Sequence, residues 1–225
     1  VEGPAIMSAQ LGSQRDIRND AKQHGWITTD TLLNNPYINK FNENFTLTAN
    51  VEPLPDIKID VNAFRTYTWI HQEYYKANSD GLFDSYSPME TGTFTMSYII
   101  IGTSFTKMNS DNTSPLFEKM KSYRLEIAQR YSAQNPWSAG KVDSTGYPYG
   151  YGPNDQEVLT SAFLAAYAGR DPSSIGLTSF PSIPLPNWRI TYDGLMKIKV
   201  LKKIFRTFTL SHAYNSTYNV GSFTS

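Results

Sequence analysis

The stretch from 44 to 76 constrains the fold most, because its residues alternate between apolar and polar with a period of two. From Phe45 to Val51, apolar residues take every odd position and Thr or Asn every even one. A second arm keeps this phase from Ile57 onward, and the two prolines at 52–56 cannot continue a ladder of backbone hydrogen bonds. A period of two is typical of a strand with one apolar and one polar face. The pattern therefore predicts an antiparallel hairpin.

Five segments in all carry strand patterns, and two carry helix patterns. A first helix is predicted from Ser114, a hydroxyl N-cap followed by a proline, to about Ala133. A second helix is predicted to start in the segment Asn154–Glu157, which resembles a capping box with Glu157 at the third helical position, and to stop at Gly169. The strands are predicted at 44–52, 56–72, 93–105, 187–194 and 206–221.

These elements divide the chain into four predicted parts. They are an irregular region at 1–43, a hairpin with a third strand at 44–112, a helical insertion at 113–170, and a Pro-rich connection with the last strands at 171–225. In the first part, 15–22 favours one or two helical turns. In the last part, 197–203 is a short basic amphipathic piece, either a helix at a membrane rim or a charged connection.

Composition favours a protein with much of its surface away from water. Charged residues make up 18% of the chain and aromatic residues 14%, whereas a typical soluble domain is about 25% charged. The formal net charge is zero, so no nucleic-acid partner is expected. The chain has no cysteine, which excludes disulfides and thiolate metal sites. No run of about 18 apolar residues exists, so any membrane crossing is expected by strands.

Motifs that would indicate catalysis or metal binding are absent from the sequence. His24, His71 and His212 lie in three separate segments without the spacing of metal ligands. There is no nucleophile elbow and no Gly-rich phosphate loop. We therefore expect neither an enzyme nor a cofactor or metal site.

The apolar rows of the predicted strands are expected to meet lipid rather than a protein core. Five strands are too few to close a membrane barrel, which needs at least about 8. The polar rows are mostly Thr, Ser and Asn rather than charged, and aromatic residues gather near strand ends, as they do at membrane interfaces. The pattern therefore favours a piece of a barrel wall that is completed by the rest of its own chain.

Several segments resemble one protein family. They are GSQRDIR at 12–18, GWIT at 25–28, LPNWRITYDGL at 185–195 as the most specific piece, and KIFRTFTLSH at 203–212. Together they resemble the C-terminal portion of the SprA/Sov family, the giant outer-membrane translocons of the Bacteroidetes type IX secretion system, which also serves gliding motility. The similarity is weakest at 77–184.

That resemblance implies a location, an activity and partners. The location is the outer membrane, and the activity is the export of folded cargo proteins through a protein-conducting channel. The implied partners are a PorV-like small barrel and a periplasmic plug protein, beside the secreted cargo and the outer-membrane lipid. The chain would then be a small portion of a far longer polypeptide.

The resulting prediction is a mostly β fold in which antiparallel strands form part of a large outer-membrane β-barrel wall, with a two-helix insertion. Both faces of this wall follow from the alternation. The residues expected to face lipid are Phe45, Leu47, Val51, Ile57, Ile59, Val61, Phe208 and Leu210. The residues expected to face the lumen are Thr46, Thr48, Asn50, Lys58, Asp60 and Asn62.

A second interpretation stays open. The same strands could build a soluble cell-surface β-sandwich that binds a ligand at the aromatic loop Tyr147–Tyr151. Aromatic residues between glycines in a long loop more often pack the loop against the protein than bind a ligand. The two interpretations differ in what covers the apolar rows, which is lipid in the first and protein in the second.

Overall fold

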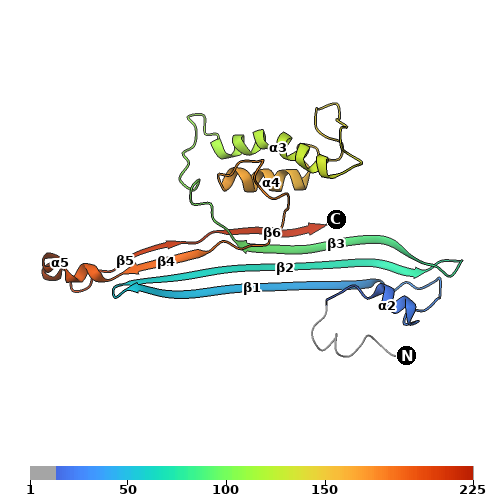
Figure 1. Ribbon diagram of the computed structural model, residues 1–225, viewed down its shortest axis with the longest axis horizontal. Coiled ribbons are helices and arrows are strands. Elements are labelled where there is room, and N and C mark those ends of the chain that lie inside the picture. Colours follow the sequence, from blue (N-terminus) through green and yellow to red (C-terminus); the bar gives the residue numbers. More distant parts are fainter. Residues whose placement is uncertain (1–13, 225) are drawn as a thin grey trace. The chain divides into compact units, whose positions relative to one another are not determined.

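The computed structural model describes residues 14–224 (Figure 1). It is mostly antiparallel β, and its described strands belong to one six-stranded sheet. The strands are β1 (Tyr37–Leu54), β2 (Ile57–Ala77), β3 (Phe83–Ser97), β4 (Asn187–Tyr192), β5 (Leu210–Tyr214) and β6 (Thr217–Thr224). The helices are α2 (Arg18–Gln23), α3 (Pro115–Gln134), α4 (Gln156–Tyr167) and α5 (Lys199–Ile204), and a short 3-10 helix, η1 (Gly194–Lys197), precedes α5.

The chain divides into two compact units. The first unit, 14–97 with 188–224, holds the sheet together with α2, η1 and α5. The second unit, 98–187, holds α3 and α4.

The hairpin of β1 and β2 is longer than the sequence predicts. It pairs from Tyr37 with Glu73 to Leu54 with Ile57, and β2 alone has 21 residues. At about 3.3 Å per residue such a strand is roughly 70 Å long. The prediction missed 37–43 because the odd positions there carry Asn39 and Glu43 among aromatic residues, so this segment is strand without being uniformly apolar.

The third row of the sheet is made of two strands that follow one another. β1 occupies one edge of β2 along its whole length, so both β3 and β4 lie on the other edge. β3 pairs with Arg65 to Ala77, and the backbone N–H of Asp193, just after β4, donates to the carbonyl of Asp56 at 3.0 Å. β4 therefore lies beside the first part of β2. In the fourth row, β6 pairs with β3 and β5 with β4, so the sheet is a four-row meander whose third row is split by the segment 98–186.

The bounds predicted for the strands after the hairpin also differ from the structure, and the strand predicted at 187–194 is β4, which ends at Tyr192. The strand predicted at 93–105 is β3, which runs from Phe83 to Ser97, and the chain turns after it because the Thr103 and Ser104 hydroxyls donate to the Ile100 carbonyl (3.1 and 2.9 Å). The strand predicted at 206–221 starts only at Leu210 and continues to Thr224, with a break at 215–216.

Both predicted long helices are present in the second unit. Ser114 Oγ accepts from the Phe117 N–H (3.4 Å) at the start of α3. Asp155 Oδ1 accepts from two backbone N–H groups at the start of α4. Between the helices, the Tyr131 hydroxyl and Ser161 Oγ are 2.9 Å apart in a buried hydrogen bond. The residues that pack around it include Ile127, Ala128, Val158, Ala162, Ala165 and Ala166, all buried.

Gly92 in β3 is a point where only glycine fits. A Cβ there would lie 2.2 Å from the Thr68 carbonyl oxygen and 2.5 Å from the Phe223 ring. We expect Gly92→Ala to lower the free energy of unfolding by about 2–3 kcal/mol, because a backbone atom has to move. Gly221→Ala in β6, where nothing lies within 4 Å of the added Cβ, is the matched control and should change the urea midpoint, measured in dodecyl maltoside, little. Equal midpoints for the two variants would contradict the close packing of β2, β3 and β6.

Candidate functional site: the two faces of the sheet

The apolar residues at 45–51 and 57–63 of the hairpin share one face of the sheet. Directly paired residues point to the same side and neighbours along a strand to opposite sides, and the pairs include Leu47 with Ala63 and Val51 with Ile59. On this face, called the apolar face here, Phe45, Leu47 and Val51 are 46%, 52% and 48% exposed. The face also carries Ile57, Ile59 and Val61, which are half-buried.

The strands β4 and β5 extend the apolar face. The backbone N–H of Asp193 donates to the carbonyl of Asp56, so these two residues are paired. The next pair along β4 and β2 is then Tyr192 with Ile57. Tyr192 in turn pairs with Leu210, which is 56% exposed. Leu210 therefore shares the face to which the sequence assigned it. Phe208, predicted on the same face, lies outside the strands, where its ring contacts that of Phe205 at 5.2 Å.

The opposite face carries hydroxyl and amide groups. Asn50 pairs with Asp60 and donates to its carboxylate (2.7 Å), and the Asn62 amide donates to Thr48 Oγ1 (3.4 Å). This face, called the polar face here, continues into β3 and β6. The predicted lumen-facing residues Thr46, Thr48, Asn50, Lys58, Asp60 and Asn62 are all on it, followed by Thr66, Thr68, Thr91, Thr93, Thr95, Thr217 and Asn219.

An aromatic cluster borders the aliphatic part of the apolar face. The rings of Phe41, Phe94 and Phe223 lie 6.0, 6.1 and 6.3 Å from that of Tyr67. Phe94 also contacts Tyr218 at 5.8 Å and is fully buried. Further along, Trp188 of β4 stacks on Tyr214 of β5 at 4.6 Å. Aromatic side chains thus form a band across four rows of the sheet.

Beyond the aromatic cluster, the apolar face becomes ionic around Glu73. This carboxylate is 1% exposed and accepts hydrogen bonds from Arg18 of α2 and from Ser85 of β3. His71 lies between two carboxylates, with Nε2 3.4 Å from Glu73 and Nδ1 3.4 Å from Glu90. His71 Nε2 is buried and makes no well-aligned hydrogen bond.

Arg18 joins α2 and the residues before it to this ionic cluster. Its guanidinium also bonds both carboxylate oxygens of Asp16 (2.6–3.1 Å), and the Tyr37 hydroxyl donates to the same carboxylate at 3.1 Å. Hydrogen bonding to Arg18 lowers the pKa of Asp16 to about 2. Burial by itself would raise the pKa of Glu73, but the hydrogen bonds from Ser85 and Arg18 outweigh it, so this pKa lies below its usual value.

These two lowered pKa values predict acid sensitivity. A carboxyl with a lowered pKa binds fewer protons in the folded state, so its stabilisation is present above about pH 4 and is lost as the pH falls towards the folded pKa. We expect the urea midpoint to fall between pH 4.5 and about pH 2, the pKa of Asp16. The fall should be smaller in Arg18→Ala, which lacks the partner that lowers both values. Identical pH profiles would contradict this assignment.

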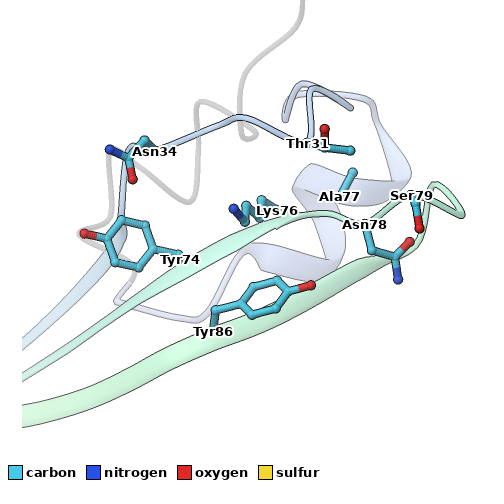
Figure 2. A pocket seen from close by; sticks show the side chains of 8 residues that line it. All are labelled: Thr31, Asn34, Tyr74, Lys76, Ala77, Asn78, Ser79 and Tyr86. Carbon is cyan, nitrogen blue, oxygen red and sulfur yellow. The ribbon is translucent and has the colours of Figure 1, made fainter.

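A polar hollow lies beside the β2–β3 turn, at the end of the sheet opposite the β1–β2 turn (Figure 2). Tyr74, Lys76 and Tyr86 contribute side chains from the two strands, and Thr31 and Asn34 border it from the segment before β1. The hollow has a volume of about 490 Å³, and Lys76 Nζ lies 5.5 Å from the centre of the Tyr86 ring. It offers one ammonium group beside phenol rings and amides, which is binding chemistry without a catalytic group.

The aromatic loop of the second interpretation is packed against its own unit. The Tyr151 ring stacks on Tyr131 of α3 at 5.5 Å and its hydroxyl accepts from the Asn135 amide (3.3 Å). Tyr149 contacts the edge of Trp137 at 5.7 Å, and the ammonium of Lys141 lies 5.1 Å from the Trp137 ring. Tyr151 is thus packed against α3, while Tyr149 and Trp137 remain 51% and 61% exposed.

Sequence reasoning missed the ionic cluster. Its signal was present, because Glu73 and His71 continue the odd register that is apolar from Ile57 to Ala63. A charged residue in an apolar register indicates a buried partner. Arg18, 55 residues away in the chain, could not be identified as that partner from spacing alone.

The comparisons with known proteins give no family. No protein-family model matches the chain, and no curated protein is similar to it. Among residues 14–224, no three His, Asp or Glu side chains are grouped so that they could hold a metal ion. None of the helices in this part of the chain has the length and apolar character needed to span a membrane.

Proposed function

We propose that the chain is a section of the wall of an outer-membrane protein-conducting barrel, the kind of translocon that its sequence resembles. One observation carries the proposal: along 45–51 and 57–63, one face of the sheet has exposed apolar side chains and the other has mainly hydroxyl and amide groups with Lys58 and Asp60. In a membrane barrel, apolar side chains face lipid and polar side chains face the water-filled lumen. On this proposal Leu47 and Val51 contact acyl chains, while Thr48 and Asn62 line the lumen.

The free edges of the sheet support the same proposal. Within residues 14–224 no strand pairs with the outer edge of β1 or with that of β5 and β6. The side chain of Gln14 bonds the backbone N–H and carbonyl of Asn42 and so covers β1 at that point. An unpaired backbone group in hydrocarbon costs several kcal/mol, so the edges need further strands, which the rest of the same chain would supply.

Strand length and residue type indicate which part of the sheet meets lipid. A tilted strand crosses the hydrocarbon with about 9–11 residues, and β2 has 21. The aliphatic stretch from Leu47 to Val51, with its partners Ile59 to Ala63, is the part suited to lipid, and the ion pair between Arg65 and Glu43 lies beyond it. The aromatic cluster then lies at the interface, and the ionic cluster around Glu73 projects into water.

The proposed work of the polar face is to let cargo pass. Along 46–50 and 58–62 the hydroxyl and amide groups bind water well, and the charges of Lys58 and Asp60 are opposite in sign, so a folded protein finds little apolar surface and no strong field on which to stay. The helical unit 98–187 then serves outside the hydrocarbon as a cap or as a docking surface. By the resemblance, the partners at such a surface are a small barrel protein and a periplasmic plug.

Detergent dependence tests this proposal against a free-standing soluble module. Expressed alone without detergent, the chain is expected to aggregate, since within residues 14–224 no strand pairs with the outer edges of the sheet and Leu47 and Val51 are about half exposed. In dodecyl maltoside it should give a strand-rich circular dichroism spectrum. Replacing Leu47, Val51 and Ile59 by Thr should raise the soluble fraction without detergent. A monodisperse, cooperatively melting monomer of the native sequence in plain buffer would contradict the barrel-wall proposal.

A further inference from the structure

Residues 193–209 connect β4 to β5 and contain η1 and α5. This connection, called the basic cap here, lies at the end of the aliphatic stretch. Both of its ends are fixed. Asp193 accepts from the Thr209 hydroxyl (2.7 Å), and its backbone N–H donates to the Asp56 carbonyl in the β1–β2 turn. Lys197 forms an ion pair with the Asp56 carboxylate. The cap therefore belongs to the same end of the sheet as that turn (Figure 1).

The charge of the basic cap is almost entirely of one sign. It contains Lys197, Lys199, Lys202, Lys203 and Arg206, and no acidic residue follows Asp193 in the chain. Apart from Lys197, these cations have no acidic partner among residues 14–224. Lys199 and Lys203 are four residues apart on α5, a spacing at which like charges destabilise a helix. Bound anions would relieve this repulsion.

The same short helix also exposes apolar side chains. Val200 and Ile204, four residues apart, are 65% and 67% exposed. Helical geometry puts them on one side and Lys202 on the opposite side, while Lys199 and Lys203 flank the apolar pair. Next to α5, Ile198 and Phe205 are 50% and 42% exposed. A segment that exposes both unpaired cations and apolar side chains matches the chemistry of a lipid interface, where acyl chains and phosphates meet.

We infer that the basic cap binds anionic lipid headgroups, with Val200, Ile204 and Phe205 in the acyl region and Lys199, Lys202, Lys203 and Arg206 on phosphates. The inference rests on the proposed function for its location, because the aliphatic stretch that ends at this cap is the part assigned to lipid. An acidic protein or a nucleic acid would be bound by the lysines alone, and would leave the four exposed apolar side chains unused. A phosphate-bearing membrane surface uses both sets.

A unique fluorophore tests the inference, because the chain has no cysteine. Thr207→Cys places an environment-sensitive label in the cap, and Ser79→Cys places a control label in the exposed β2–β3 turn. The full chain is diluted from dodecyl maltoside into vesicles of phosphatidylcholine, alone or with a third phosphatidylglycerol. We expect the label at 207 to become brighter and blue-shifted with phosphatidylglycerol only, and the label at 79 to stay unchanged. The response should fall in 0.5 M salt.

Charge and apolar variants separate the two contributions. Lys202→Glu with Lys203→Glu should lower the equilibrium constant for binding of the cap to lipid, reported by the label at 207, by roughly 30-fold or more. Each cation near an anionic surface contributes about fivefold to that constant. Lys107→Glu with Lys141→Glu, the same change in net charge placed in the other unit, should have little effect. Val200→Ser with Ile204→Ser should weaken the response in the presence of phosphatidylglycerol. Equal effects of the two lysine pairs, or a label at 207 that ignores phosphatidylglycerol, would overturn the inference.

Flotation of the same samples separates this inference from the proposed function. Chain that floats with phosphatidylcholine vesicles but shows no response at 207 would retain the barrel wall and reject lipid binding by the cap. If the chain floated only with vesicles that contain phosphatidylglycerol, and the label at 207 responded to them, lipid binding by the basic cap would be supported and insertion of the sheet into the bilayer would be rejected. Polyglutamate is added as a competitor at the same concentration of negative charge as the phosphatidylglycerol. Loss of the fluorescence response at 207 would identify the cap as a site for acidic polypeptides instead.

Discussion

Arginine on the apolar face should block assembly of the sheet in a bilayer, while a charge change on the polar face is tolerated. Leu47→Arg and Ile59→Arg place a guanidinium where acyl chains are expected, at a cost of about 2–4 kcal/mol each near the bilayer centre. Thr48→Arg and Lys58→Glu are next to these positions in sequence but point to the opposite side. Their side chains stay in water, so we expect an effect below about 1 kcal/mol. The measurement is the fraction of chain protected from protease after folding into phosphatidylcholine vesicles.

A further variant on the apolar face controls for depth. Asn39 pairs with His71 and so lies on the same side as Leu47, but beyond the aromatic cluster. Asn39→Arg should therefore assemble almost like the native chain. If Leu47→Arg, Thr48→Arg and Asn39→Arg were equally impaired, the loss would reflect arginine in a strand in general, and the lipid-facing assignment would be wrong.

Local patterns in the sequence predicted the part of the sheet where side chain type follows the strand period. From Phe45 to Val51 and from Ile57 to Ala63 the alternation is regular, and the structure pairs these two stretches residue by residue. The first half of β3 was missed because Phe83 to Gly92 contains serines, a proline and a bulge, where Ser87 has a φ of 51°. Such a segment is strand because neighbours pair with it, not because of its own composition.

The connectivity of the third row could not be read from the sequence either. Ser97 ends β3 and Trp188 lies in β4, yet both strands pair with the same edge of β2. A strand pattern states which residues alternate and does not state which edge they occupy. The ionic cluster was missed because Arg18 and Glu73 are far apart in the sequence. Arg18 contacts Glu73 only because the long hairpin brings the start of β1 next to the end of β2.

Removing Arg18 should destabilise the end of the sheet at the β2–β3 turn by leaving the buried Glu73 carboxylate without its counter-charge. Glu73 is 1% exposed, and without the guanidinium its negative charge keeps only the Ser85 hydroxyl and the more distant His71 as partners. Breaking a buried ion pair costs about 3–5 kcal/mol. The Arg18 side chain is 28% exposed, which lets water approach the remaining charge, so we expect the lower end, about 3 kcal/mol.

Two comparisons decide whether the cost comes from the uncompensated charge. Arg15→Ala removes a neighbouring arginine that is 58% exposed and pairs with Asp20, and exposed pairs contribute below about 1 kcal/mol. Glu73→Gln added to Arg18→Ala should restore much of the lost stability, because a neutral amide can stay buried beside Ser85 without a counter-charge. Thermal unfolding in dodecyl maltoside gives the differences. If Arg18→Ala cost no more than Arg15→Ala, or if Glu73→Gln restored nothing, α2 would be held to the sheet by packing alone and the ionic cluster would be incidental to stability.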